Sequence, residues 1–341
     1  MTANMIFIIG APRSGTTMLE HMLAAHSQIQ GGPEPHLITP LAHLGVWAKV
    51  DKAPYDHILA AEAQQLFVSQ LPNGETDYWR ACRAYCDVLY GGYLQARGDK
   101  RFCLDKTPAY ALVLPFLARV YPDAAYLVLT RHPLAIFSSF ANSFFDGDYQ
   151  GAHAYNPIIE RYVPAMAAFL RESQPPKLHV RYEDLVRNPE TWFEKICLHI
   201  GVPYEPQAIE YGKAGEDAAR PKGGLGDPIG VNSHSAPTTK SIKKWVAEVA
   251  SDPAKLDLTR RIIAAVNPDD LDVLGYPVET IWKPLEEAGG KVRVPKPPKL
   301  TRYRLERKMI MRLRGMAQRS RLLRKTLEKT RLACDVLLRE K

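Results

Sequence analysis

One short segment near the start of the chain constrains the fold more than any other. The apolar run 5–9 ends at Gly10, and a turn then leads to a second glycine, Gly15, followed by Thr16 and Thr17. Such a strand–turn–helix binds phosphate, because backbone N–H groups and the positive end of the helix dipole converge on one anion. The spacing follows G-x-x-x-x-G-K-[ST], but Thr16 occupies the lysine position. We therefore expect a single 5′-phosphate with a transferable group rather than a triphosphate.

The remainder of the chain alternates between strand and helix patterns, which predicts a parallel sheet covered by helices on both faces. The run 125–129 is continuously apolar, as is typical of a parallel strand buried on both sides. The predicted fold class is α/β with a P-loop-NTPase-like sheet. Expected strands are 5–9, 102–104, 125–129 and 178–181, and expected helices are 16–25, 39–48, 55–70, 78–97, 108–120, 133–145, 157–173 and 189–200.

Four residues lie just after these predicted strands: Gly10, Asp105, Arg131 and Tyr182. Ligands of parallel sheets bind beyond the carboxyl ends of the strands. We therefore expect these positions to share one crevice.

The composition is that of an ordinary soluble protein, with 46% hydrophobic and 24% charged residues. No stretch approaches ~18 uninterrupted apolar residues, and the N-terminal run lacks the basic flank of a signal peptide. The five cysteines follow no disulfide or metal-binding pattern, so a reducing cytoplasm is expected and no metal is indicated.

The net charge of +8 is unevenly distributed along the chain. Residues 291–341 hold 18 Lys plus Arg against 4 Asp plus Glu, so this segment carries +14 and residues 1–290 carry −6. Proline residues at 295, 297 and 298 precede a helical pattern with apolar residues on one face. Two units are expected: a domain over 1–290, and a proline-rich linker with a basic amphipathic helical extension over 291–341.

Five motifs resemble those of the sulfotransferases that use 3′-phosphoadenosine 5′-phosphosulfate, and they occur here in the order of that family. The motif Pro-Arg-Ser-Gly-Thr-Thr is most similar to that of bacterial members and of the tyrosylprotein branch. The resemblance covers about residues 5–280. The motifs begin at Gly10, at Asp105 (Asp-Lys-Thr-Pro), at Leu129 (Leu-Thr-Arg-His-Pro, with Ser139), at Arg181 (Arg-Tyr-Glu-Asp-Leu) and at Ser241 (Ser-Ile-Lys-Lys-Trp).

The resemblance implies which residues bind the donor. Arg13, Ser14, Gly15, Thr16 and Thr17 hold the 5′-phosphosulfate in this reading, and Arg131 with Ser139 hold the 3′-phosphate. An arginine fork matches a phosphate face, and the serine lies two turns into the next helix. The nucleotide bound by a kinase carries no 3′-phosphate. Arg131 and Ser139 therefore distinguish a sulfotransferase from a kinase.

The same resemblance implies the donor contacts further along the chain. Tyr182 packs near the adenine, and Lys243, Lys244 and Trp245 close a lid over the donor, although Lys243 replaces the usual glycine. The lid segment 212–241 is rich in Gly, Pro, Ser and Asn, and His234 and Ser235 are candidates for its acceptor side.

The residues expected to carry the chemistry are Arg13, Lys106, Glu34 and His36. In the resemblance Lys106 reaches the oxygen that bridges phosphorus and sulfur. Glu34 lies 21 residues after Arg13, which is the separation of the catalytic base in the tyrosylprotein branch. His36 is a rival base, because an acceptor hydroxyl must lose its proton as it attacks sulfur. The sequence leaves the choice open.

The function expected is in-line transfer of a sulfuryl group to an acceptor hydroxyl, with adenosine 3′,5′-bisphosphate as product and no metal. The acceptor is open between a lipid, a carbohydrate, a phenol and a tyrosyl group. The first alternative is an ATP-dependent small-molecule kinase, and the second is a non-catalytic, membrane-associated adaptor with the same fold.

The basic tail at 301–339 suits an anionic membrane surface, an acidic partner or the acidic body of the protein itself. A cytoplasmic protein is expected, and the sequence leaves open whether its tail binds the membrane peripherally. Nucleic acid is not expected, because no aromatic residues interleave with the cations beyond Tyr303. The oligomeric state stays open between a monomer and a homodimer.

Overall fold

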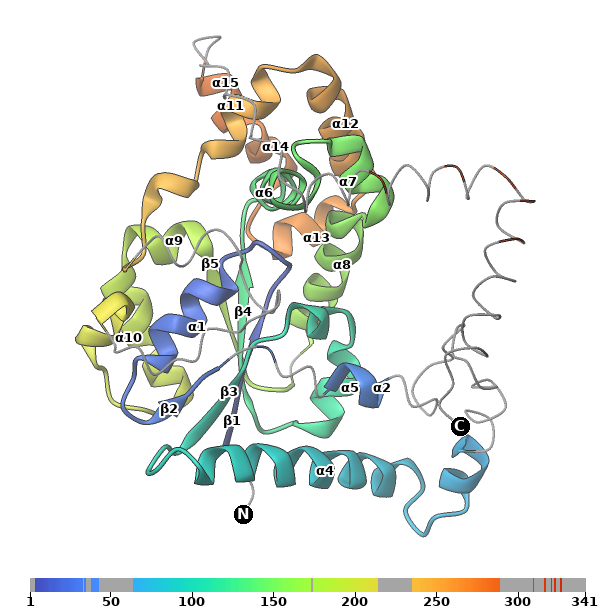
Figure 1. The fold of residues 1–341 in the computed structure, drawn as a ribbon, viewed down its shortest axis with the longest axis vertical. Helices are drawn as coiled ribbons and strands as arrows, with labels where there is room; N and C mark the ends of the chain where they lie inside the picture. The colour runs from blue at the N-terminus through green and yellow to red at the C-terminus, as the bar shows by residue number, and fades with distance from the viewer. Residues whose placement is uncertain are drawn as a thin grey trace.

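A five-stranded, wholly parallel sheet forms the centre of the molecule (Figure 1). The computed structural model describes residues 4–32, 34, 38–42, 64–172, 174–213 and 235–288, together with five single residues between 309 and 326. The strands lie in the order β2-β3-β1-β4-β5. Their bounds are β1 Asn4–Ile9, β2 Ile29–Gln30, β3 Phe102–Asp105, β4 Ala125–Thr130 and β5 Lys177–Arg181. The predicted α/β fold is confirmed.

The helices follow the strands in alternation along the first two thirds of the chain. Proline occupies the first turn of several of them, where its missing N–H costs nothing. The helices up to β5 are α1 Thr16–Ala24, α2 Ile38–Ala42, α4 Glu75–Gln95, η1 Pro108–Leu112, α5 Leu114–Val120, α6 Pro133–Phe145, α7 Tyr149–Tyr155 and α8 Ile158–Arg171. After β5 come α9 Tyr182–Arg187, α10 Pro189–Ile200, η2 Pro206–Ile209, η3 Tyr211–Lys213, η5 Thr239–Ser241, α11 Lys244–Ala250, α12 Pro253–Ala264, α13 Pro268–Val273, α14 Val278–Ile281 and α15 Lys283–Glu287.

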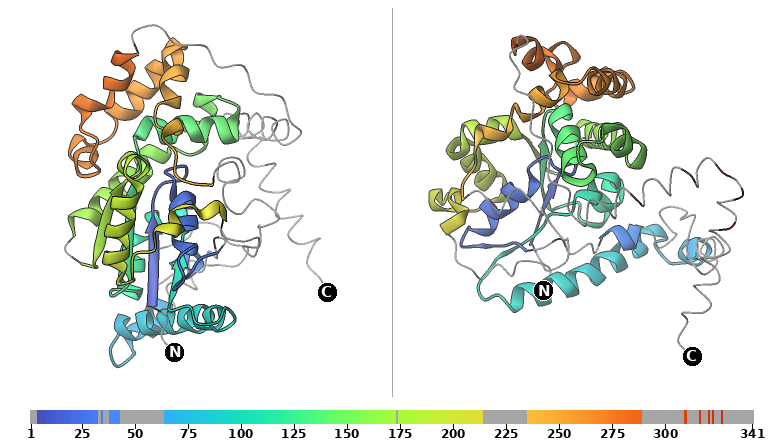
Figure 2. Two further views of the ribbon diagram at one scale, coloured as in Figure 1. Left: turned by 90° about the vertical axis from the view of Figure 1, so that its left-hand side faces the viewer. Right: turned by 45° about the horizontal axis from the view of Figure 1, so that its top comes forward.

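Alternate residues of the central strand enter two separate hydrophobic cores. Ile6 and Ile8 belong to one core, whereas Phe7 and Ile9 belong to the other, as the two-residue repeat of a strand requires. The first core is closed by α1, α9 and α10, and the second by α5, α6, α8 and the C-terminal helices (Figures 1 and 2). Both faces of the sheet are therefore covered, and ligands have access at its ends.

The structure departs from the predicted elements at a few places. The expected helix 108–120 is divided into η1 and α5, because Val113 leaves the helical conformation at φ −129°. The short strand β2, the helices α7 and α9 and the helices α11 to α15 were not predicted. Part of the expected helices 39–48 and 55–70 lies outside the described residues.

Helices after residue 240 pack back onto the sheet domain. Trp245, Val249, Leu258 and Ile262 enter the larger core, and α11 packs on α6 while α13 packs on α8. Figure 2 shows these orange helices at one end of the molecule, next to the green helices. The predicted extension 291–341 lies almost wholly outside the described residues. Within the described residues, no helix is both long and apolar enough to cross a bilayer.

Candidate active site

The loop between β1 and α1 turns sharply in front of the first helix. Arg13 has φ 72° and Gly15 has φ 102°, and both values lie in the left-handed region that residues with a Cβ rarely adopt. The Ser14 amide donates to the Ala11 carbonyl at 3.1 Å, which closes the turn. A Cβ on Gly15 would lie 2.6 Å from the Tyr182 ring. The loop therefore needs glycine here both for its conformation and for close packing.

The residues expected to bind the two ends of the donor meet around this loop. Arg13 Nε donates to Ser139 Oγ at 3.1 Å, which connects the loop to α6. The Arg131 guanidinium lies over the Tyr182 ring, with 4.3 Å from its carbon to the ring centroid. Arg131 follows β4, Tyr182 follows β5 and Ser139 lies in α6, at the predicted positions.

Arg131 is held by two backbone carbonyls, and its binding of the 3′-phosphate together with Ser139 stays a prediction. Its NH1 donates to the Arg13 carbonyl at 2.9 Å, and its NH2 donates to the Ser241 carbonyl at 2.8 Å. Burial lowers the pKa of the Arg131 guanidinium. The side chain thus links the β1–α1 loop to the segment before α11, and Ser139 accepts a hydrogen bond from Arg13.

Two buried polar atoms at this place have no hydrogen-bond partner among the described residues: Ser14 Oγ and Arg131 Nε. Buried hydrogen-bonding groups are nearly always satisfied, so an unpartnered pair of donors is informative. Both can donate to an anion, and both lie in a loop region rich in positive charge. The residues present therefore fit an anionic ligand at the N-terminus of α1.

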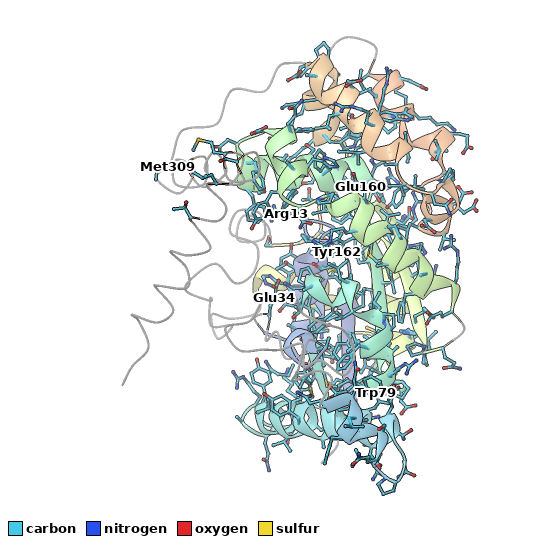
Figure 3. The ribbon with its side chains drawn as sticks, turned by 90° about the vertical axis from the view of Figure 1, so that its right-hand side faces the viewer. Arg13, Glu34, Trp79, Glu160, Tyr162 and Met309 are labelled. Atoms are coloured by element: carbon cyan, nitrogen blue, oxygen red, sulfur yellow. The ribbon has the colours of Figure 1, made fainter. Side chains whose placement is uncertain are left out.

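Lys106 and Glu34 form an ion pair beside the neighbouring strand β3. The Lys106 side chain is 2% exposed and that of Glu34 is 13% exposed, so the pair is shielded from water. Figure 3 shows Glu34 and Arg13 toward the same side of the ribbon. Two of the predicted catalytic residues, far apart in the sequence, are thus in direct contact.

Asp105 holds the segment around Glu34 through hydroxyl groups. Its carboxylate accepts hydrogen bonds from Tyr110 at 2.9 Å and Thr107 at 3.0 Å, and it also accepts one from Tyr90. The Tyr110 hydroxyl in turn accepts a hydrogen bond from the Ile38 amide at 3.1 Å. Asp105 was expected only as a residue at a strand end, and its partners on α4 and η1 were not foreseen.

Sequence reasoning missed Glu20 and Tyr162. Glu20 lies in α1 and is 6% exposed, and burial raises its pKa to about 7. Tyr162 lies in α8 and is 5% exposed; its pKa is raised to about 12, mainly by burial and in part by the charge of Glu34. The one sequence signal for Glu20 is an acidic residue between apolar pairs at 18–19 and 22–23.

The three residues expected at the lid occupy different surroundings. Trp245 is 2% exposed and stacks on the His132 ring, with centroids 4.6 Å apart. Lys243 is exposed and pairs with Glu287 at 2.8 Å, and Lys244 is exposed at the start of α11. In this structure Trp245 anchors α11 to the core, and contact of these residues with the donor stays a prediction.

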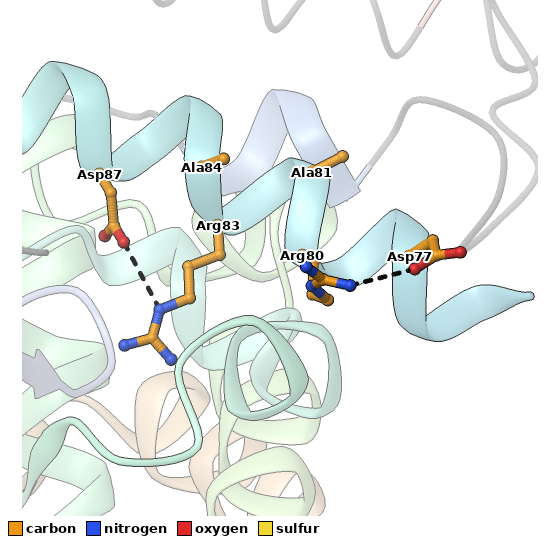
Figure 4. Close-up of a pocket in the computed structure, with 6 residues that line it drawn as sticks. All are labelled: Asp77, Arg80, Ala81, Arg83, Ala84 and Asp87. Carbon is orange, nitrogen blue, oxygen red and sulfur yellow. Dashed lines mark hydrogen bonds and ion pairs between the residues drawn. The ribbon is translucent and has the colours of Figure 1, made fainter. Parts of the chain in front are cut away.

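Other predicted positions, including His36, His234 and most of the lid, lie outside the described residues. Ser235 is described and exposed. The residues described hold no cluster of three or more His, Cys, Asp or Glu suited to a metal ion. An open hollow on α4 is lined by Asp77, Arg80, Ala81, Arg83, Ala84 and Asp87 (Figure 4). It contains none of the predicted site residues.

Comparison with known proteins identifies the family of the chain. The model of the sulfotransferase family matches residues 5–206, which is more than half of the chain. The chain belongs to the sulfotransferase family. The match includes the β1–α1 loop, Glu34, Lys106, Arg131, Ser139 and Tyr182.

Several known proteins are similar to the chain over much of its length. The chain is 28% identical to the nodulation protein NoeE of Sinorhizobium fredii, over 79% of this chain and 65% of that protein. It is 23% identical to protein-tyrosine sulfotransferase 1 of Danio rerio, over 80% of this chain and 72% of the relative. A solved sulfotransferase domain of the Synechococcus PCC 7002 olefin synthase is 25% identical, with a TM-score of 0.48, and covers 77% of this chain and 95% of that domain.

Proposed function

We propose that the protein transfers a sulfuryl group from 3′-phosphoadenosine 5′-phosphosulfate to a hydroxyl group of an acceptor. One observation carries the proposal. The unpartnered Ser14 hydroxyl and Arg131 Nε lie beside Arg13 and Ser139 at the N-terminus of α1. The adjacent strand β3 presents the Lys106–Glu34 pair next to that loop.

The donor supplies the sulfuryl group and leaves as adenosine 3′,5′-bisphosphate. Arg13, Ser14 and the first amides of α1 hold its 5′ end through charge and hydrogen bonds. Arg131 and Ser139 hold the 3′-phosphate. Lys106 stabilises the negative charge that develops on the leaving phosphate, as positioned cations do in phosphoryl transfer.

Glu34 takes the proton of the acceptor hydroxyl as the new oxygen–sulfur bond forms and the bond from sulfur to the bridging oxygen breaks. In the structure Glu34 is paired with Lys106. When Lys106 turns toward the anionic donor, Glu34 is released from the pair and becomes available as a base. One residue thereby connects donor binding to activation of the acceptor.

Ligand binding to the purified protein tests the donor. We expect adenosine 3′,5′-bisphosphate to raise the melting temperature and ATP with Mg²⁺ to have little effect. The reverse result would favour a kinase. Donor binding without turnover on any acceptor, together with vesicle binding that needs the tail, would indicate an adaptor.

Three variants test the assigned roles. Arg13→Ala and Lys106→Ala should abolish transfer of labelled sulfate, whereas Arg131→Ala should mainly weaken donor binding. Lys195→Ala is a matched control, since Lys195 lies on α10 against Trp192 and away from these contacts. Full activity of Lys106→Ala would refute its role.

The acceptor is best identified by mass analysis of a cell extract after incubation with labelled donor, with and without the enzyme. The named tyrosine-specific relatives make a tyrosyl hydroxyl one candidate, beside lipid, carbohydrate and phenol. A labelled product that forms with the wild type and not with Lys106→Ala identifies the substrate class.

A further inference from the structure

The outer face of α4 exposes a row of small and apolar side chains. The inner face is buried, because Cys82, Cys86 and Tyr90 pack into the larger core. On the opposite face, exposed residues with small or apolar side chains recur at helical intervals: Ala81, Ala84, Tyr85, Val88, Leu89 and Gly92. Residues three and four apart lie side by side on a helix. The six therefore form one continuous strip, the α4 strip.

The α4 strip faces away from the central sheet. In Figures 1 and 2, α4 runs along one end of the molecule, with the sheet on its inner side. Val88, in the middle of the strip, is 74% exposed. Single exposed apolar side chains are common on protein surfaces, whereas a contiguous strip along about three turns is typical of a contact surface.

The α4 strip is complementary to itself when two copies of the helix lie antiparallel. If the helices cross between positions 86 and 87, Ala81 of one copy comes level with Gly92 of the other. Val88 comes level with Ala84 and Tyr85 of the other copy. Small residues then face each other at both ends of the strip, where the backbones can approach closely. The larger apolar side chains pack together in the middle.

The open hollow on α4 lies beside this strip and fits the same arrangement (Figure 4). Its two arginines, Arg80 and Arg83, are paired with carboxylates of the same helix. Ala81 and Ala84 line the side of the hollow that borders the strip. Because Val88 of a second copy comes level with Ala84, its side chain can fill the hollow.

Opposite charges at the two ends of α4 favour the antiparallel direction. Glu75 and Asp77 lie in the first turn, and Arg97 follows the C-terminal cap of the helix. In the antiparallel pairing, Arg97 of each copy comes level with positions 75–77 of the other copy. A parallel pairing would bring like charges together at both ends, which disfavours association.

We propose that the α4 strip is the interface of a homodimer, in which α4 packs antiparallel on α4 of a second copy about a two-fold axis. Each copy contributes the same surface, as a two-fold interface requires. A helix of 21 residues is about 30 Å long, so the contact is at the small end of specific interfaces. Association at micromolar concentrations is therefore expected. This dimer does not depend on the transfer of a sulfuryl group.

Sedimentation velocity of the full chain, from about 1 µM to about 100 µM, measures the self-association. The wild type should show a reversible equilibrium between monomer and dimer. Val88→Glu places a carboxylate of each copy in the apolar contact and should raise the dissociation constant at least about tenfold. Leu198→Glu is the matched control, because Leu198 is also highly exposed but lies on α10, and it should leave the dissociation constant unchanged.

Three results would overturn the dimer interface. One is a wild type that stays monomeric at every concentration. Another is a dimer that Val88→Glu does not weaken, and the third is a dimer that both variants weaken equally. Circular dichroism shows whether each variant is folded. If Val88→Glu folds poorly, cross-linking decides the question.

Cross-linking tests the direction and the register of the pairing. Ala81→Cys and Gly92→Cys are prepared separately in a Cys334→Ser background; the four cysteines in the described part of the chain are buried. A Cβ at Gly92 meets nothing within 4 Å, so the cysteine fits. Mild oxidation should link the mixed variants. Each variant alone should stay largely unlinked, because equivalent positions lie about 16 Å apart along the helices. Equal linking of a single variant and of the mixture would contradict the pairing.

Deletion of 296–341 distinguishes a second copy from another occupant, the basic tail of the chain itself. The shortened chain should form dimers at least as readily as the full chain, because α4 is intact. Loss of the dimer on deletion would show that the tail holds the copies together, and it would overturn the assignment of the interface to α4.

Discussion

At the scale of single residues, the contact between Lys106 and Glu34 favours Glu34 over His36 as the base. Glu34 contacts Lys106, which is the cation expected to interact with the donor, and the Glu34 carboxylate is shielded from water. We expect Glu34→Gln to lower kcat by roughly 10²–10⁴-fold with little change in donor affinity, since general base catalysis contributes about that much. Steady-state kinetics with the identified acceptor measures both values.

His36→Asn is the matched variant for this question. It should keep kcat within a few-fold of the wild type. If His36→Asn is the inactive variant and Glu34→Gln remains active, His36 is the base, which is the alternative that the sequence left open.

Glu20 also makes folding stability depend on pH. Its pKa is about 7 in the folded protein against an ordinary value of 4.5, so the folded state binds this proton more tightly than the unfolded state. The resulting stabilisation is complete below about pH 4.5 and is lost as the pH rises through 7. The full difference corresponds to about 3 kcal/mol.

Denaturant unfolding of the wild type and Glu20→Gln from pH 4.5 to pH 8 measures this effect. The variant should gain stability relative to the wild type as the pH rises, and the difference should level off above pH 7. His132 acts in the opposite sense, because burial lowers its pKa to about 4. It is present in both proteins and cancels in the difference. A difference independent of pH would show that Glu20 is ionised throughout.

At the scale of elements, η1 holds the segment that carries Glu34. The Tyr110 hydroxyl connects Asp105 of β3 to the Ile38 amide of α2. Tyr110→Phe leaves that amide unpaired and should cost about 1–3 kcal/mol of unfolding free energy. We also expect kcat to fall while bisphosphate affinity is retained, because the base loses its placement and the donor loop is untouched.

Tyr126→Phe provides the comparison. The Tyr126 hydroxyl is also buried and donates to the carbonyls of Leu117 and Tyr121 instead of to the segment that carries Glu34. A similar loss of stability with unchanged kcat would show that the effect of Tyr110 is specific. Equal losses of kcat in both variants would point to general destabilisation.

The turn before α1 gives a second prediction at this scale. Gly15→Ala places a Cβ at φ 102° and against the Tyr182 ring. We expect the turn to open, with at least tenfold weaker bisphosphate binding, because the strained backbone costs of order 1–3 kcal/mol. Gly98→Ala, also at positive φ but with nothing near its Cβ, should leave binding unchanged. Calorimetry on both variants is the measurement.

The alternation of strands and helices up to α10 was largely predictable because the hydrophobic patterns and the turn residues agree along this part of the chain, whereas β2, α7, α9 and the helices after residue 240 were missed. The Gly10–Thr17 loop, with the polar positions at the ends of β3, β4 and β5, also indicated one shared site. The hydrogen bonds and ion pairs between the site residues were not predictable, since they depend on the conformations of the side chains. Nothing in the sequence shows that Arg131 binds two carbonyls or that Glu34 contacts Lys106. Glu20 looked like an ordinary helical glutamate, because burial depends on the packing of α1 against the segment at 31–34.

At the scale of the whole molecule, the opposite charges of the two predicted units matter most. Residues 291–341 carry +14 and residues 1–290 carry −6. We expect the full chain to bind vesicles that contain anionic lipid, and salt to release it, since such attraction is screened within about 10 Å at 0.1 M salt. Deletion of 296–341 should abolish vesicle sedimentation and lower activity on a lipid-presented acceptor. Activity on a soluble analogue should be retained, and equal loss on both acceptors would count against membrane presentation.

The bond from Arg131 to the Ser241 carbonyl has a practical meaning for anyone shortening this gene. The family match stops at residue 206, yet a partner of a central arginine and the tryptophan that stacks on His132 both come from beyond that point. A fragment trimmed to the matched region would keep every recognisable motif up to Tyr182. It would still remove the Ser241 carbonyl from the Arg131 guanidinium and the Trp245 ring from the face of His132. Such a fragment should aggregate on expression, whereas one that extends through α15 should stay in solution.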